Sequence, residues 1–484
     1  MEDSSGWDDP DLKEKNLPHR IIVYELNEVP YKVFDHYCDH FKNGALARLR
    51  KQSTAFETFA EDSGHLSPWV TWPTLHRGVL NDEHEITDFG QNLRSVNREL
   101  PPIWDILSRR GIKVGMFGSL HTHPLPDNVK DYAFYVPDTF AAGPECFPEQ
   151  YEVFQAFNLA MTGKNASQVN SGIALKEAAR FVAASPGLGI SGRTLTKLVG
   201  QIASERLNKN RLVRRRTSQV QIAFDFFLKA LWREHPEASF FFTNHVASSL
   251  HRYWPSLFPE DYEDLRYDLD WLTAWKNEIP FTLHEADYQV SQLIAFTERN
   301  PGYKLIVATS MGQAAVQGTE RENRRVVVTG LNRLMKGLGL GDEEWKKRPA
   351  MVPHYNAWIT PEKRNEFLQK LSALTINGKC IRAEPLGEGI YRLEISLINQ
   401  AEILVEFEGG PADPAVFGIA NLDLQDAAGS NAYHVPDGIL AIYDPRIAGS
   451  LERHRISTLD VAPTILQNFG ITPPQYMQSG FKLG

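Results

Sequence analysis

The chain has few cysteines and no long apolar run, and both absences exclude classes of protein. Its three cysteines, Cys38, Cys146 and Cys380, lie far apart in 484 residues, so we expect neither a disulfide framework nor a cysteine-rich zinc site. No apolar run approaches the roughly 18 residues that a membrane-spanning helix needs. The acidic, polar start lacks the pattern of a secretory signal. We therefore predict a cytoplasmic protein with no membrane span.

Positive charge is not in excess either. Lys and Arg number 51 against 60 for Asp and Glu, which gives a net charge of -9 and no general attraction for nucleic acid. Apolar residues at 42% and charged residues at 23% are ordinary for a globular protein and exclude disordered, collagenous and coiled-coil chains. We expect no nucleic-acid partner, and the composition leaves the oligomeric state open.

Strand-like and helix-like patterns alternate along most of the chain. Buried-strand patterns cover residues 20–26, 112–118, 303–310 and 437–445, and helical patterns lie between them. This alternation predicts an α/β fold with a doubly wound, mostly parallel sheet sandwiched by helices. In such a sheet, ligands bind at the carboxyl ends of the strands.

Two stretches interrupt the alternation and predict insertions into the core. One is mostly helical in pattern and contains the basic run 206–216, whose guanidinium groups either hold a phosphate or form a solvated face. The other alternates in strand fashion and predicts a small α+β cap. The predicted order is an N-terminal tail (1–18), a first core segment (19–149), the helical insertion (150–237), a second core segment (238–359), the cap (360–412) and a third core segment (413–484).

Polar residues follow the predicted strands where a ligand is expected. In chain order, the blocks are IIVYELNEVP, VTWPTLHRGVLNDEHEI, FTNHVASSLHRYW, LIVATSMGQ and YHVPDGILAIYDP. Their order and content resemble the alkaline phosphatase superfamily, and within it the type I phosphodiesterase and nucleotide pyrophosphatase branch. The resemblance covers roughly residues 19–125, 238–320 and 430–475, and it is most specific in the last block.

The resemblance implies an alkaline phosphatase-like fold and chemistry on a phosphate ester or phosphodiester, by hydrolysis or transfer. In that family two metal ions hold the phosphoryl oxygen while a Thr or Ser attacks. Thr71 matches the nucleophile, and His251 and His434 match two metal-binding histidines. The implied partner is a small phosphorylated or glycan substrate, linked to a nucleotide or a sugar.

The metal-ligand positions depart from the family pattern. Asn27 stands where the family has an Asp, with Glu25 and Glu28 on either side of it, and Ala247 replaces a second Asp. The strand end that should read Thr-Ser-Asp-His-Gly reads Thr-Ser-Met-Gly-Gln at 309–313. One metal site has thus lost its Asp, Asp and His ligands, although hard divalent ions need that carboxylate charge.

Two accounts of the site remain open. In the first, His245 joins His251 and His434 to bind one divalent ion, zinc or manganese, since three histidines suit zinc with an open position. In the second, no metal is bound and the polar strand ends act through hydrogen bonds. The residues predicted to bind substrate in either account are Glu25, Asn27, Ser310 and Gln313.

Two further pairs lie near these strand ends. Asp62 and His65 precede Thr71 and are either a source of a general base or solvated side chains. His121 and His123 follow a predicted strand and are either site residues or plain loop residues.

The leading functional hypothesis is a diverged phosphoester enzyme, and two alternatives accompany it. The first is a pseudoenzyme that binds an anionic ligand or a protein partner, which the loss of metal ligands favours. The second is a metal-independent transferase in surface-glycan assembly, which the polar replacements at the strand ends would suit.

Overall fold

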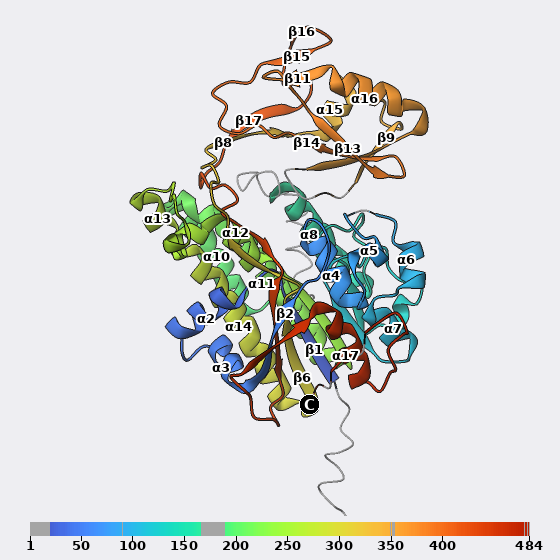
Figure 1. Ribbon diagram of the computed structural model, residues 1–484, viewed down its shortest axis with the longest axis vertical. Helices are drawn as coiled ribbons and strands as arrows, with labels where there is room; N and C mark the ends of the chain where they lie inside the picture. The colour runs from blue at the N-terminus through green and yellow to red at the C-terminus, as the bar shows by residue number, and fades with distance from the viewer. Residues whose placement is uncertain are drawn as a thin grey trace, which may run out of the picture.

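The computed structural model describes residues 20–89, 91–165, 189–348 and 354–478, together with residues 350, 480, 481 and 483. An α/β core lies at one end of the molecule and a smaller, strand-rich cap at the other (Figure 1). No helix in the described ranges combines the length and the apolar character needed to cross a membrane.

A single eight-stranded sheet forms the centre of the core. Its order is β20 (Arg453–Ser457), β2 (Ser53–Phe59), β19 (Asp437–Tyr443), β6 (Tyr303–Ala308), β1 (Arg20–Leu26), β5 (Ala238–Thr243), β3 (Val114–Phe117) and β4 (Phe134–Val136). Strand β19 runs antiparallel to both of its neighbours, and the other neighbouring pairs are parallel. The prediction of a mostly parallel α/β sheet is confirmed.

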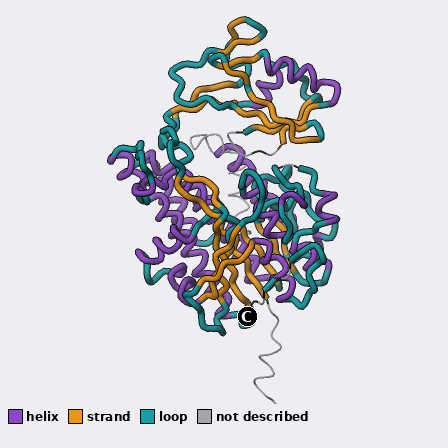
Figure 2. Tube along the Cα trace, viewed as in Figure 1, coloured by secondary structure: helices purple, strands orange, loops and turns teal. Residues whose placement is uncertain are grey.

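Helices cover both faces of this sheet, as Figure 2 shows. Successive strand residues point to opposite faces, so Ile22 and Tyr24 join one apolar cluster while Ile21 and Val23 join the other. Helices on the first face are α2 (Tyr31–His40), α3 (Ala45–Gln52), α8 (Glu152–Asn165), α11 (Arg215–Glu234), α12 (His245–Leu257), α13 (Leu269–Trp275) and α14 (Glu278–Arg299). Helices on the second face are α4 (Pro68–Arg77), α7 (Ile103–Arg109) and α17 (Val461–Asn468). The short helices α5 (Asn81–His84) and α6 (Arg94–Glu99) follow α4.

Helix α4 begins at Pro68 and holds a second proline, Pro73, inside it. Proline lacks an N–H group, so the carbonyl of Trp69, four residues earlier, loses its usual helical partner. His121 Nε2 lies 2.8 Å from that carbonyl oxygen and supplies the hydrogen bond instead. A side chain from another segment therefore satisfies the backbone of α4.

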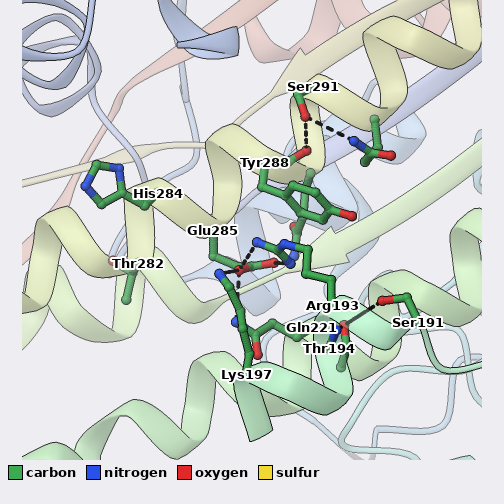
Figure 3. Close-up of polar contacts among 12 residues, drawn as sticks. Ser191, Arg193, Thr194, Lys197, Gln221, Thr282, His284, Glu285, Tyr288 and Ser291 are labelled. Atoms are coloured by element: carbon green, nitrogen blue, oxygen red, sulfur yellow. Dashed lines mark hydrogen bonds and ion pairs between the residues drawn. The ribbon is translucent and has the colours of Figure 1, made fainter. Parts of the chain in front are cut away.

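Helix α10 (Gly192–Leu207) is anchored to the core through a buried carboxylate (Figure 3). Arg193 donates two hydrogen bonds to Glu285 of α14, at 2.9 and 3.1 Å, and Lys197 donates one at 3.0 Å. Gln221 of α11 donates a fourth at 2.9 Å. Burial alone would raise the pKa of Glu285, and the two cations lower it instead. These contacts tie α10, α11 and α14 together.

The cap has its own core, drawn from residues between Val326 and Ile419. The domain boundaries predicted from the sequence stay predictions. The strands of the cap are β8 (Arg324–Val328), β9 (Trp345–Arg348), β10 (Tyr355–Ile359), β11 (Leu374–Ile376), β12 (Lys379–Cys380), β13 (Arg382–Gly387), β14 (Ile390–Glu394), β15 (Val405–Phe407), β16 (Gly410–Ala412) and β17 (Ile419–Asp423). They form antiparallel sheets in the orders β13-β14-β10-β9, β12-β11-β15-β16 and β17-β8, beside α15 (Leu331–Gly337) and α16 (Arg364–Ser372).

A two-stranded ribbon leads from the core toward the cap. It pairs β7 (Gly312–Ala315), which follows β6, with β18 (Ala432–Val435), which precedes β19. His434 lies opposite Gln313 in its register. Two of the predicted site residues are therefore neighbours across this ribbon.

Candidate functional site

Three side chains from distant segments meet at the carboxyl end of the central sheet. Glu28 follows β1, His251 lies in α12 and His434 lies in β18. The Nε2 atoms of His251 and His434 lie 2.9 Å and 3.3 Å from Oε2 of Glu28. One ligand atom from each residue lies within 4.8 Å of the others. We call these three residues the triad.

A proline inside α12 positions His251. Pro255 has no N–H to offer the carbonyl of His251, and that carbonyl accepts from the backbone N–H of Asn431 at 2.7 Å. In return, Nδ1 of His251 lies 2.7 Å from the carbonyl oxygen of Ala432. This reciprocal pair fastens the start of β18 to α12 and so brings His434 beside His251.

Backbone conformation directs Glu28 into the site. Its φ is +59°, a left-handed value that is uncommon for a residue other than glycine and is associated with functional strain. The side chain is almost fully buried. Asn27 Nδ2 donates to its Oε1 at 2.7 Å, and Gln313 Nε2 donates to its Oε2. Two amides therefore orient the carboxylate.

The hydrogen bonds of the two rings determine what the triad can hold. A carbonyl oxygen only accepts, so Nδ1 of His251, facing Ala432, carries its hydrogen, and so does Nδ1 of His434, 2.7 Å from the carbonyl of Leu66. With Nδ1 carrying a hydrogen, the Nε2 atom of each ring faces the carboxylate of Glu28, as a lone pair in a neutral ring or as a donor in a protonated one. Two nitrogen lone pairs and a carboxylate oxygen repel one another at the distances found here. The arrangement is therefore stable only with positive charge between these atoms, from protons or from a metal ion.

The electrostatics of the triad agree with that need. Burial by itself would raise the pKa of Glu28, but the charges of His434 and His251 outweigh it and hold that pKa well below its usual range. Burial would likewise lower the pKa of His434, and the carboxylate of Glu28 raises it. The site thus favours a negative carboxylate surrounded by positive charge.

The donor set fits a single zinc-like ion. Two histidines and one carboxylate are a known set for catalytic zinc, with Zn–N and Zn–O lengths of about 2.0–2.2 Å. Tetrahedral ligand atoms at those lengths lie about 3.3 Å apart, close to the 2.9 and 3.3 Å found here. Anchoring Nδ1–H on a carbonyl is the usual support for a metal-bound histidine. The side chain of His251 is 25% exposed, which leaves one side of the triad open.

His245 lies apart from the triad. Its Nδ1 lies 2.6 Å from Thr243 Oγ1, and its Nε2 lies 3.1 Å from the carbonyl oxygen of Thr282. Burial lowers its pKa to about 4, so the ring is neutral. Both of its nitrogens already contact protein atoms, whereas Glu28 supplies the third ligand atom beside His251 and His434.

Thr71 and Ser310 contact each other. Their hydroxyl oxygens lie 2.8 Å apart, and Thr71 also donates to the carbonyl of Ser67 at 3.2 Å. The backbone N–H of Thr71 bonds within α4, to that same carbonyl. Both side chains are fully buried, so a substrate reaches the Thr71 hydroxyl only after neighbouring groups move.

Asn27 connects the Thr71 helix to the triad. Its Oδ1 accepts from Trp72 Nε1 at 2.8 Å, and its Nδ2 donates to Glu28 and to Asn244 Oδ1. Asn244 is exposed. Glu25 points to the face of β1 that α4 covers and lies 2.7 Å from His76 Nε2, where both side chains are buried. That contact holds α4 against the sheet.

The structure separates the two residues of the predicted pair Asp62 and His65. His65 is exposed, with its ring 6.4 Å from that of His434 and its Nε2 3.2 Å from Tyr433 Oη. Asp62 is buried and accepts from Thr74 Oγ1 and from the N–H of Asn81. His65 therefore lies at the rim of the triad, while Asp62 supports the turn after α4.

His121 and His123 face a different hollow. They line a cavity of about 140 Å³ beside the start of α4. Cap residue Arg348 and the rings of Phe89 and Phe140, with centroids 3.9 Å apart, also line it. Burial lowers the pKa of His121 to about 3, so this ring is neutral.

Sequence reasoning did not place Glu28 beside His251 and His434. The family position for a carboxylate is that of Asn27, and Glu28 was noted merely as its neighbour. The available signal was a carboxylate two residues past the end of a buried strand, where a left-handed residue can redirect a side chain. The sequence does not show that φ value.

Comparisons with known proteins give remote structural similarity. No protein-family model matches the chain, and no curated protein matches it. Murine ectonucleotide pyrophosphatase/phosphodiesterase 5 aligns over 95% of this chain and 97% of its own, at 10% identity and a TM-score of 0.38, and an inactive variant in complex with AMP gives the same values. The human protein aligns over 96% and 97%, at 10% identity and a TM-score of 0.37. These TM-scores are below the level that indicates a shared fold.

Proposed function

We propose that the protein is an enzyme that acts on a phosphate ester or phosphodiester through one divalent metal ion bound by Glu28, His251 and His434. The observation that carries the proposal is the triad itself, with two anchored imidazoles and a carboxylate converging from three segments. The motif resemblance in the sequence supplies the substrate class. Bound at the triad, the ion would act as a Lewis acid on a phosphoryl oxygen.

The chain's own groups have defined tasks in this proposal. The Ala432 and Leu66 carbonyls orient the two rings, and the Asn27 amide orients Glu28. The exposed edge of His251 and the side chain of Asn244 face the approach to the site. Thr71, on the helix that Asn27 contacts through Trp72, would be the nucleophile or a substrate contact.

Hydrolysis of a chromogenic phosphodiester, assayed with added zinc or manganese, tests this function. We expect turnover by the wild type and a loss of about 100-fold or more in Thr71→Ala, because a nucleophile has no substitute in a methyl group. Thr71→Ser keeps the hydroxyl and is the matched control. Turnover that survives both Thr71→Ala and a metal chelator would contradict the proposal.

A second candidate is a binding protein for an anionic ligand, without turnover. It is favoured by the burial of the Thr71 hydroxyl and by the Glu28 carboxylate, which already has Asn27, Gln313 and two histidines as partners. Such a protein would show a rise in melting temperature with inorganic phosphate and no product release. A transferase would release product only when its acceptor is present.

A further inference from the structure

The arginines of the basic run 206–216 have different partners. Arg214 donates to Glu278 at 2.6–3.1 Å, and Arg215 donates to Glu205 at 2.8 and 2.9 Å. Arg216 has no carboxylate partner among the described residues, and its hydrogen bond goes to Ser248 Oγ at 3.2 Å. Among these three neighbouring arginines, Arg216 is the one without a carboxylate partner in the described part of the chain.

Arg216 lies where positive charge exceeds negative charge. Its charged neighbours are Arg252 and Asp426, and Arg252 is already paired with Asp426 through Nε and Nη2. Tyr253 donates to the same carboxylate at 2.8 Å. Two guanidinium groups against one carboxylate leave one positive charge in a partly buried place, and an unpaired cation out of bulk water is costly until an anion joins it.

Arg216 contacts α12 close to a triad residue. Ser248 and His251 are three residues apart on α12, so they share one face of that helix, and Asn244 is the residue just before its start. Helix α11 lies next to α12 (Figure 1), and the Arg216–Ser248 bond joins them one turn before His251. The Arg214–Glu278 and Arg215–Glu205 pairs, made by the two residues just before Arg216, hold this end of α11 in place.

We propose that Arg216 binds the anionic group of the ligand that occupies the triad site. The inference rests on the proposed function in taking that group to be a phosphate, whose oxygens match the donor fork of a guanidinium. The helical insertion would then contribute a ligand-binding residue to the site, in addition to packing on the core. Burial, and after it the charge of Arg252, lowers the pKa of Arg216. A bound anion would favour the charged guanidinium and so raise that pKa again.

Calorimetric titration with inorganic phosphate tests the role of Arg216. We expect saturable binding by the wild type, weaker by about tenfold to a hundredfold in Arg216→Gln, because a charge-assisted hydrogen-bonding group is lost. Arg216→Lys keeps the charge and should lie between the two. Arg211→Gln removes one charge from an exposed position in the same run and should bind as the wild type does.

Three results would overturn the inference: no phosphate binding by the wild type, equal affinity in Arg216→Gln, or an equal loss in Arg211→Gln. Melting curves of Arg216→Gln check that it folds, and Arg216→Lys keeps the test valid if it does not. Failure of the proposed function is a separate outcome. In that case no phosphodiester is hydrolysed, while phosphate affinity still depends on Arg216.

Discussion

The conformation of Glu28 decides which carboxylate reaches the site. At a strand end, Glu25 points into the core toward His76, and Asn27 supplies an amide. Only after the left-handed turn at Glu28 does a carboxylate face His251 and His434. Glu25, Asn27 and Glu28 thus make different contacts although they lie within four positions of one another. The backbone conformation, rather than the residue type, determines which contact each side chain makes.

Asp62 gives a prediction on the pH dependence of stability. Burial raises its pKa from 3.8 to about 6, and its Oδ2 has no hydrogen-bond partner among the residues that the structure describes. The folded state therefore binds this proton more tightly than the unfolded state. The stability that the proton contributes is present below about pH 3.8 and is lost as pH rises through about 6.

Replacing Asp62 with Asn should remove that dependence. The amide keeps an acceptor for Thr74 and Asn81 without a charge, so we expect a gain of about 1–3 kcal/mol at pH 7. Melting temperatures measured from pH 4 to pH 7 should vary less in Asp62→Asn than in the wild type. An unchanged pH slope would show that Asp62 is not the group responsible.

Two helices use an internal proline to build the site region. Pro73 in α4 leaves the Trp69 carbonyl to His121, and Pro255 in α12 leaves the His251 carbonyl to Asn431. In a helix interior, proline normally costs stability through this lost bond. Here each freed carbonyl ties its helix to another segment, and the second tie places β18 beside His251.

The anchoring of the insertion can be tested at Glu285 of α14. Glu285→Gln removes the buried counter-charge of Arg193 and Lys197, which are themselves partly exposed, so we expect a loss of about 2 kcal/mol in the free energy of unfolding. Glu298→Gln on the same helix breaks an exposed pair with Arg48 and should cost about 1 kcal/mol or less. Urea denaturation followed by tryptophan fluorescence compares them, and equal midpoints in the two variants would contradict this account.

At the scale of the whole molecule, the sheet was predictable because its signals are local. The apolar runs of β1, β5, β6 and β19 are short, rich in buried residues and separated by helical patterns. In a largely parallel sheet the residues after such strands gather at one edge. That rule brings the segments of Glu28 and His251 to one edge. His434 reaches the same edge because it precedes β19, which runs antiparallel to its neighbours.

The rest of the site depends on contacts that the sequence does not display. His245 and His251 lie on the same helix, six residues apart, yet His245 points to Thr243 and Thr282 while His251 points to Glu28. Arg216 differs from Arg214 and Arg215 only in what happens to lie opposite it. Tertiary packing determines which of several residues of the same type reaches the site, and the sequence pattern does not contain that information.

The metal content of the purified protein tests the central claim most directly. Elemental analysis after dialysis against zinc should give about one zinc per wild-type chain and none in Glu28→Gln, while His245→Gln keeps the ion. The same zinc content in the wild type and Glu28→Gln, or none in either, would contradict a metal site at the triad.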